Sequence, residues 1–158
     1  MNQIKLMTIL CFIASLSFAQ ESIGGRPYSF DNNVRVDVPF FTTTNINIEE
    51  LLMEDANQNF GKFRYGYRYE TSISMETHGT WEVLDNGDSI WRLTIESNDA
   101  YSIGLVYNDF ILPEGTMFYI YNEDESFILG GYTSDNNADA FSTPQLPGDK
   151  CTLEYYEP

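Results

Sequence analysis

The most regular hydrophobic pattern of the chain lies within residues 80–121. Between residues 89 and 96, Trp91, Leu93 and Ile95 alternate with polar side chains. A period of two indicates a β-strand with one buried face. Shorter apolar stretches follow as far as Tyr121, so this region predicts the central strands of a β-rich fold.

The tripeptide Asp85-Asn86-Gly87 predicts a tight hairpin, because Asn and Gly tolerate the positive φ that such turns require. A two-residue loop would place Trp81 opposite Arg92. A three-residue loop with a left-handed Gly87 would place Trp81 opposite Trp91 and Val83 opposite Ser89. A shift of one residue moves every side chain to the other face. The three-residue loop gathers the apolar residues on one face and is therefore favoured.

Further strands are expected at residues 34–38, 62–75, 127–129 and 151–156, while residues 132–147 are rich in turn-forming types. Short strands with this spacing are typical of a β-sandwich or jelly roll. The predicted fold class is therefore all-β: an antiparallel β-sandwich or jelly-roll-like domain with one short N-terminal helix. The predicted core consists of Trp81, Trp91, Leu93, Ile95, Ile103, Leu105, Tyr119 and Tyr121.

The one helix is expected at residues 48–59. Asn47 can cap its N-terminus, and Glu49 and Glu50 suit the positive end of the helix dipole. Leu51, Leu52 and Ala56 provide a narrow apolar stripe, and Gly61 is expected to end the helix.

Residues 1–19 have the features of a secretory signal peptide. A polar start with one cation precedes the apolar run 6–16, and Ser17-Phe18-Ala19 offers a cleavage site near Ala19. That run is shorter than the roughly 20 apolar residues that span a bilayer, and no later stretch could span one. We therefore expect an exported chain without a membrane span. Its parts would be the signal peptide 1–19, an N-terminal arm with a short strand at 20–47, and a non-catalytic β-sandwich domain at 48–158.

The chain is strongly acidic. Without the signal peptide, seven basic residues stand against 24 acidic ones, which gives a formal charge of −17. This argues against nucleic acid and anionic membrane surfaces as partners, because both require a cationic face. It suits a soluble extracellular protein or one that docks on a cationic partner.

Basic residues gather in the predicted strand 62–75. Lys62, Arg64 and Arg68 share one face, and aromatic residues occupy the other. This basic face is either a solvated surface paired with nearby carboxylates or a contact strip for a partner. The three residues are the candidate partner contacts. Aromatic residues at this spacing can bind sugar but more often belong to a core.

The sequence offers no complete catalytic or metal-binding set. His78 is the only histidine, and Cys151 is the only cysteine that remains after signal cleavage, which excludes a Cys–His site and an internal disulfide. No serine lies in a context typical of a catalytic triad. The acidic turns 85–88, 122–124 and 135–139 could bind calcium, but they lack the ligand spacing of an EF-hand and are explained by turn chemistry. We expect no catalytic residue, cofactor or metal.

An ordered series of short motifs carries a family resemblance. Over residues 50–158 the chain resembles the N-terminal region of secreted bacterial lysyl endopeptidase-like serine proteases. The clearest motifs are Gly79-Thr80-Trp81, Leu112-Pro113-Glu114-Gly115, Phe118-Tyr119-Ile120-Tyr121, Gly130-Gly131-Tyr132-Thr133 and Leu153-Glu154-Tyr155-Tyr156-Glu157-Pro158.

In that family, the region is a non-catalytic β-rich propeptide or accessory domain that precedes a trypsin-like domain. The resemblance implies that the chain belongs to a longer secreted protease and acts as a folding aid, inhibitor or accessory module. Its partner would be the downstream protease domain of the same protein. No catalytic position of the family has a counterpart here, so proteolysis would belong to the parent protein. The alternative is a free-standing extracellular β-sandwich module that binds glycan or calcium.

Overall fold

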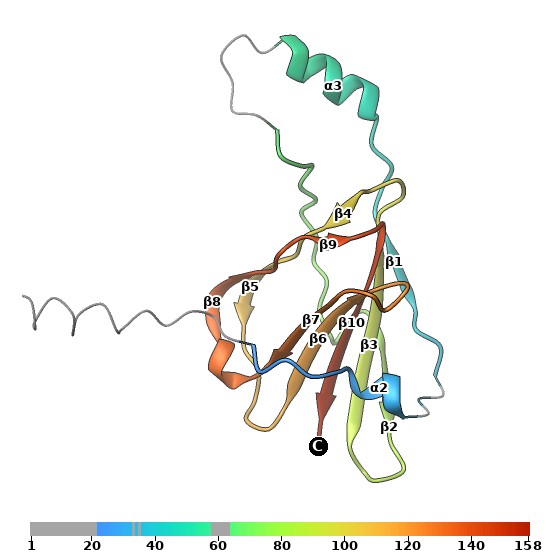
Figure 1. The fold of residues 1–158 in the computed structure, drawn as a ribbon, viewed down its shortest axis with the longest axis vertical. Helices are drawn as coiled ribbons and strands as arrows, with labels where there is room; N and C mark the ends of the chain where they lie inside the picture. The colour runs from blue at the N-terminus through green and yellow to red at the C-terminus, as the bar shows by residue number, and fades with distance from the viewer. Residues whose placement is uncertain (1–21, 33, 35, 58–63) are drawn as a thin grey trace, which may run out of the picture.

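The computed structural model describes residues 22–158 except residues 33, 35 and 58–63 (Figure 1). Its largest element is a six-stranded sheet in the order β1-β3-β10-β6-β7, with β2 also paired to β3. These strands are β1 (Phe40–Thr42), β2 (Thr80–Val83), β3 (Ser89–Glu96), β6 (Met117–Asn122), β7 (Ile128–Tyr132) and β10 (Lys150–Glu157).

Two smaller antiparallel sheets accompany the large one. The first pairs β4 (Ser102–Ile103) with β9 (Leu146–Pro147), and the second pairs β5 (Val106–Phe110) with β8 (Ala138–Ser142). Phe110, Phe141 and Leu146 from these sheets belong to the same buried cluster as Trp91 and Leu93 of β3. The small sheets therefore cover one face of the large sheet, which we call the inner face.

Helical structure is sparse in the described residues. There it comprises α2 (Tyr28–Asp31), α3 (Ile48–Asn57) and the 3₁₀ turn η1 (Ser134–Asn136). The predicted fold class, a β-rich domain with one short helix, is confirmed. The expectation of purely antiparallel pairing is wrong at one place, because β1 runs parallel to the end of β3. No helix within the described residues is long and apolar enough to cross a membrane.

The hairpin β2–β3 has the predicted register. Trp81 pairs with Trp91 and Val83 with Ser89 across a three-residue loop. The amide of Leu84 donates to the carbonyl of Asp88 at 2.8 Å, and Gly87 has a φ of 93°. Glycine adopts this left-handed conformation without the steric cost that a Cβ would add.

The predicted core residues of β3 and β6 are buried, as expected, whereas the prediction is wrong at Trp81. Trp91, Leu93 and Ile95 are buried on the inner face, and Ile103 and Leu105 pack against them. Trp81 is 45% exposed, because it lies in a strand at the edge of the sheet. In β6 the inner face belongs to Phe118 and Ile120, so Tyr119 and Tyr121 are buried on the opposite face, which we call the outer face.

Two predicted strands are absent. The described residues within 34–38 form no strand, and β1 begins after Pro39. The carbonyl of Val36 accepts a hydrogen bond from the Arg92 side chain, and the amide of Val36 donates to the Glu82 side chain. Side chains thus satisfy backbone groups that a neighbouring strand would otherwise bind. Residues 64–74 also lack strand structure. Conversely, the turn-rich stretch 132–147 contains β8 and β9, which the pattern did not reveal.

The predicted helix is present as α3 (Ile48–Asn57), and its expected end at Gly61 lies outside the described residues. The amide of Glu50 donates to Oδ1 of Asn47 at 3.3 Å, as expected for the cap. None of the helix residues is buried. Figure 1 shows α3 far from the sheets, at the end of an excursion between β1 and β2.

Trp91→Ala should lower the free energy of unfolding by about 3–5 kcal/mol, as for other buried aromatic residues. The ring is 2% exposed, its Nε1 donates to the carbonyl of His78 at 2.8 Å, and Gly79 packs against it. Urea unfolding followed by circular dichroism measures the loss. Trp81→Ala, which removes a half-exposed indole opposite Trp91, is the matched control and should cost much less. Equal losses in the two variants would contradict this account of the core.

Candidate functional site

The N-terminal arm, residues 22–32, crosses the outer face of the large sheet. The ring of Tyr28 stacks on Tyr156 with centroids 4.7 Å apart, and Phe30 meets Tyr121 edge-on at the same distance. The amide of Ile23 donates to the carbonyl of Gly131 at 3.1 Å. A Cβ on Gly131 would overlap the carbonyl of Gly24, so this close approach requires glycine.

A buried carboxylate fixes the arm to the sheet. Glu154 of β10 is fully buried. Its Oε1 accepts from the amide of Ser29 at 3.1 Å, and its Oε2 accepts from the hydroxyls of Ser29 and of Tyr121, the latter at 3.1 Å. Burial raises the pKa of Tyr121, and the charge of Glu154 raises it further. A buried carboxylate is tolerated because its oxygens accept several hydrogen bonds.

Beside the arm, the outer face contains a groove of about 460 Å³, which we call the sheet-face groove. Ser29, Phe30 and Phe40 line it from the side of the arm and β1, and Arg92, Thr94, Thr152 and Lys150 line it from the sheet. The hydroxyls of Thr94 and Thr152 form a hydrogen bond of 3.0 Å across β3 and β10.

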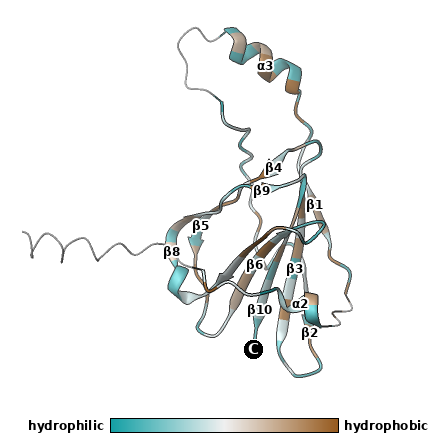
Figure 2. Ribbon diagram, viewed as in Figure 1, coloured by the Kyte–Doolittle hydropathy of each residue, from teal (hydrophilic) through white to brown (hydrophobic). Residues whose placement is uncertain are grey.

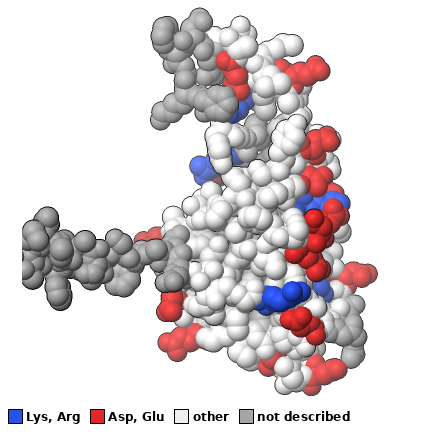
Figure 3. All heavy atoms as spheres, in the orientation of Figure 1, with Lys and Arg blue, Asp and Glu red and all other residues white. Residues whose placement is uncertain are grey.

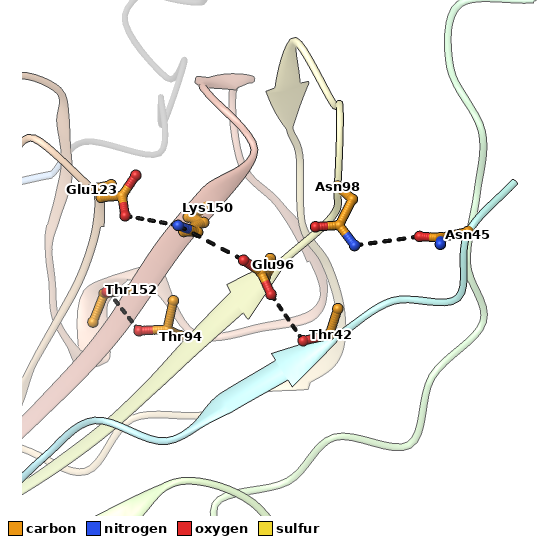
Figure 4. A network of polar contacts seen from close by, with 8 residues as sticks. All are labelled: Thr42, Asn45, Thr94, Glu96, Asn98, Glu123, Lys150 and Thr152. Atoms are coloured by element: carbon orange, nitrogen blue, oxygen red, sulfur yellow. Dashed lines mark hydrogen bonds and ion pairs between the residues drawn. The ribbon is translucent and has the colours of Figure 1, made fainter.

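A charged network forms one end of this groove (Figure 4). Nζ of Lys150 lies 2.8 Å from Oε1 of Glu123 and 3.7 Å from Oε1 of Glu96. The hydroxyl of Thr42 donates to Glu96 at 3.0 Å. The hydrogen bond to Glu123 is the main cause of a raised pKa of Lys150. The cation is thus matched by carboxylates.

The groove offers hydroxyl groups and one exposed aromatic ring. Thr94 and Thr152 offer hydroxyl groups, and the Phe40 ring is 60% exposed at the rim. Sugars combine hydroxyl groups with apolar ring faces that pack on aromatic side chains. Sequence reasoning missed this site. The alternation in β3 marked Thr94 as outward, but Lys150, Thr152 and Phe40 lie in separate parts of the chain.

The candidate partner contacts lie elsewhere. Lys62 is outside the described residues. Arg64 forms ion pairs with Glu54 at 2.8 Å and Asp55 at 3.2 Å, both in α3. Arg68 pairs with Glu70 at 2.8 Å in a highly exposed position. Arg64 and Arg68 therefore belong to an irregular segment, and Arg64 holds that segment to α3.

His78 has no carboxylate partner within the part of the chain that the structure describes. Its Nδ1 lies 2.8 Å from the hydroxyl of the adjacent Thr77, which in turn contacts Ser74 at 2.9 Å. These contacts belong to one exposed turn. A triad requires a carboxylate to orient the histidine, so the described arrangement does not provide the machinery of a serine protease.

Cys151 and the acidic turns have structural explanations. Cys151 is buried in the core, and burial raises the pKa of its thiol to about 12. In two of the turns, Asn86 accepts from the amide of Asp88, and Asp124 accepts from Ser126. The hydrogen bonds from Ser126 lower the pKa of Asp124. Within the described residues, no group of three or more His, Cys, Asp or Glu side chains is arranged to hold a metal ion.

No protein-family model matches this chain. No solved structure matches it either.

Replacing Tyr121 should change how stability depends on pH. Its folded pKa lies above the unfolded value of about 10, so its contribution is complete below pH 10 and is lost as the pH rises toward the folded pKa. Tyr121→Phe should cost about 1–3 kcal/mol at pH 7 through the lost hydrogen bond to Glu154. Above pH 10 its stability should fall less steeply than that of the wild type, by up to about 1.4 kcal/mol per pH unit.

Urea midpoints between pH 7 and pH 11.5 provide this comparison. Tyr101→Phe is the control, because the Tyr101 side chain is 97% exposed and should give the wild-type curve. A curve for Tyr121→Phe that runs parallel to the wild type at every pH would show that this hydroxyl does not titrate as its burial requires.

Proposed function

We propose that this chain is the non-catalytic N-terminal domain of a secreted lysyl endopeptidase-like serine protease. In this role it binds the protease domain of the same protein and acts as a folding aid, an inhibitor or an accessory module. The observation that carries the proposal is the placement of the resembling motifs. They fall on β2, β6, β7 and β10, which are strands of one sheet, and on the turn that precedes β6. The resembling segments thus belong to one packed unit.

The chemistry of the described residues supports a non-catalytic role. The ring of His78 bonds to the neighbouring Thr77 hydroxyl rather than to a carboxylate. The buried carboxylate of Glu154 accepts three hydrogen bonds, two of them from Ser29 of the N-terminal arm. Proteolysis would therefore be carried out by another domain of the parent protein.

The charge of the molecule supports a cationic partner. Acidic side chains are numerous over the face in Figure 3, and basic ones are few. The whole chain has a formal charge of −16. Electrostatic complementarity of this kind accelerates association and weakens as salt is added.

The purified chain without its first 19 residues should bind the protease domain encoded downstream in the same gene, and should bind it more weakly at 0.5 M salt. Isothermal titration calorimetry at two ionic strengths measures this. The chain alone should not hydrolyse lysine amide substrates. Any of three results would overturn the proposal. The first is hydrolysis by the chain alone that a serine-directed inhibitor stops, the second is a gene without a downstream protease domain, and the third is no binding at low salt.

We propose, as a second candidate, that the sheet-face groove binds a neutral oligosaccharide. The groove combines the hydroxyls of Thr94 and Thr152 with the exposed ring of Phe40, and Lys150 at its end is paired with Glu123. This candidate corresponds to the free-standing binding module that the sequence left open.

If the groove binds sugar, titration with cellohexaose or chitohexaose should shift the amide signals of β3 and β10 in NMR spectra. Phe40→Ala should weaken this binding at least about tenfold, because a sugar ring would pack its apolar face on this aromatic side chain. Phe127→Ala removes a partly exposed ring outside the groove and is the matched control. Absence of any shift at millimolar sugar would overturn this candidate.

A further inference from the structure

The excursion that carries α3 is built differently from the rest of the molecule. We call α3 together with residues 64–70 the α3 projection. Figure 1 shows it standing away from the sheets. None of the ten residues of α3 is buried. Because an isolated helix of this length is marginal in water, and helices in proteins gain most of their stability by burying an apolar face, a helix in this position lacks its usual source of stability.

Ion pairs hold the projection together, and a hydrogen bond joins it to the segment that precedes α3. Arg64 bonds to Glu54 and Asp55 of α3, and the hydroxyl of Tyr69 donates to the carbonyl of Thr44 at 2.7 Å. The rings of Tyr67 and Tyr69 meet edge-on at 4.9 Å. The side of α3 that bears Leu51 and Asp55 is half-buried. Arg64 thus has an internal partner, and its role is to position α3.

Next to Leu51 and Asp55, the same broad face of α3 carries exposed apolar residues. Ile48, Leu52 and Ala56 follow one another at intervals of four and therefore lie along one stripe. Leu52 and Met53 are 63% and 64% exposed. Figure 2 shows apolar positions alternating with polar ones along the helix. On the returning segment, Tyr65 is 79% exposed. Contiguous exposed apolar side chains mark interaction sites.

We propose that the apolar stripe of α3 is the surface on which this domain docks to the protease domain, inserting into an apolar groove rimmed by basic residues. The proposal rests on the proposed function. Insertion of an amphipathic helix into a groove is a common mode of recognition, with anchors at intervals of three and four residues. Leu52 is the central anchor of the stripe, and the exposed Met53 lies beside it.

Charge selects this occupant over a second copy of the chain. Of the four carboxylates of α3, Glu54 and Asp55 pair with Arg64, whereas Glu49 and Glu50 are exposed in its first turn. Two copies of α3 packed together would bring like charges into a desolvated interface, which is unfavourable. A basic rim on the partner would instead complement these carboxylates.

The test compares two double variants of the chain without its first 19 residues. Leu52→Gln with Met53→Gln removes the central anchor and its exposed neighbour and keeps good helix formers. Val106→Gln with Ile111→Gln removes two side chains of similar exposure, 64% and 72%, outside the projection. Calorimetric titration with the downstream protease domain should show binding at least about tenfold weaker for the first variant, as expected for interface anchors. The second variant should bind within about twofold of the wild type. Circular dichroism confirms that both are folded.

Hydrogen exchange gives a second readout. The amides of α3 should exchange rapidly in the free chain and more slowly in the complex, because burial of the stripe stabilises the helix. Equal affinity of wild type and Leu52→Gln/Met53→Gln, with no slowing of exchange in α3, would overturn the docking surface and leave the proposed function intact. Absence of binding by the wild type would overturn both. Analytical ultracentrifugation tests for self-association of the chain. Self-association that Leu52→Gln/Met53→Gln abolishes and Val106→Gln/Ile111→Gln does not would assign the stripe to a second copy and overturn the proposed occupant.

Discussion

The fold depends on the pairing of β10 with two neighbours at once. This strand pairs with β3 along eight residues and with β6 along six, so it joins the two halves of the large sheet. Its alternate residues also serve both faces. Cys151, Leu153 and Tyr155 enter the core of the inner face, whereas Thr152, Glu154 and Tyr156 lie on the outer face. Because these pairings join segments far apart in the sequence, the chain must close long loops before the core can form, which is expected to make folding slow.

Burial of Glu154 then constrains the outer face. A carboxylate at the centre of a sheet is unfavourable unless its oxygens are hydrogen-bonded, and Ser29 and Tyr121 supply the donors. The N-terminal arm is therefore part of the packed structure and not an appendage. Its path also fixes the glycine at Gly131, where a side chain would collide with the arm. The position of the arm beside β1 leaves the polar groove along β3 and β10.

The sequence predicted local features more accurately than features that depend on distant partners. The β2–β3 register could be predicted, because Asp85-Asn86-Gly87 and the two tryptophans lie within a few residues of one another. Both sets of alternate residues in β6 are aromatic or apolar, so the pattern does not say which set faces the core. Tyr119 and Tyr121 are buried on the outer face because the N-terminal arm covers them. The regular alternation in residues 62–70 suggested a strand, yet Arg64 pairs with α3. The alternation of polar and apolar residues does not say whether a neighbouring strand is present to form backbone hydrogen bonds with the segment. The groove escaped prediction because its residues meet only in the folded sheet.

The two parts of the molecule differ in how they use apolar side chains. In the sheets, apolar residues lie between layers, and each strand gains stability from neighbours on both sides. In the α3 projection, similar residues face solvent, and ion pairs through Arg64 maintain the geometry. Exposed ion pairs contribute little stability and are weakened by salt, so they cannot replace the missing burial. A helix held only in this way is free to adjust to another surface. The same feature that makes α3 marginal in the isolated domain thus suits it to gain its stability on binding, while the rigid sheet fixes the place from which it projects.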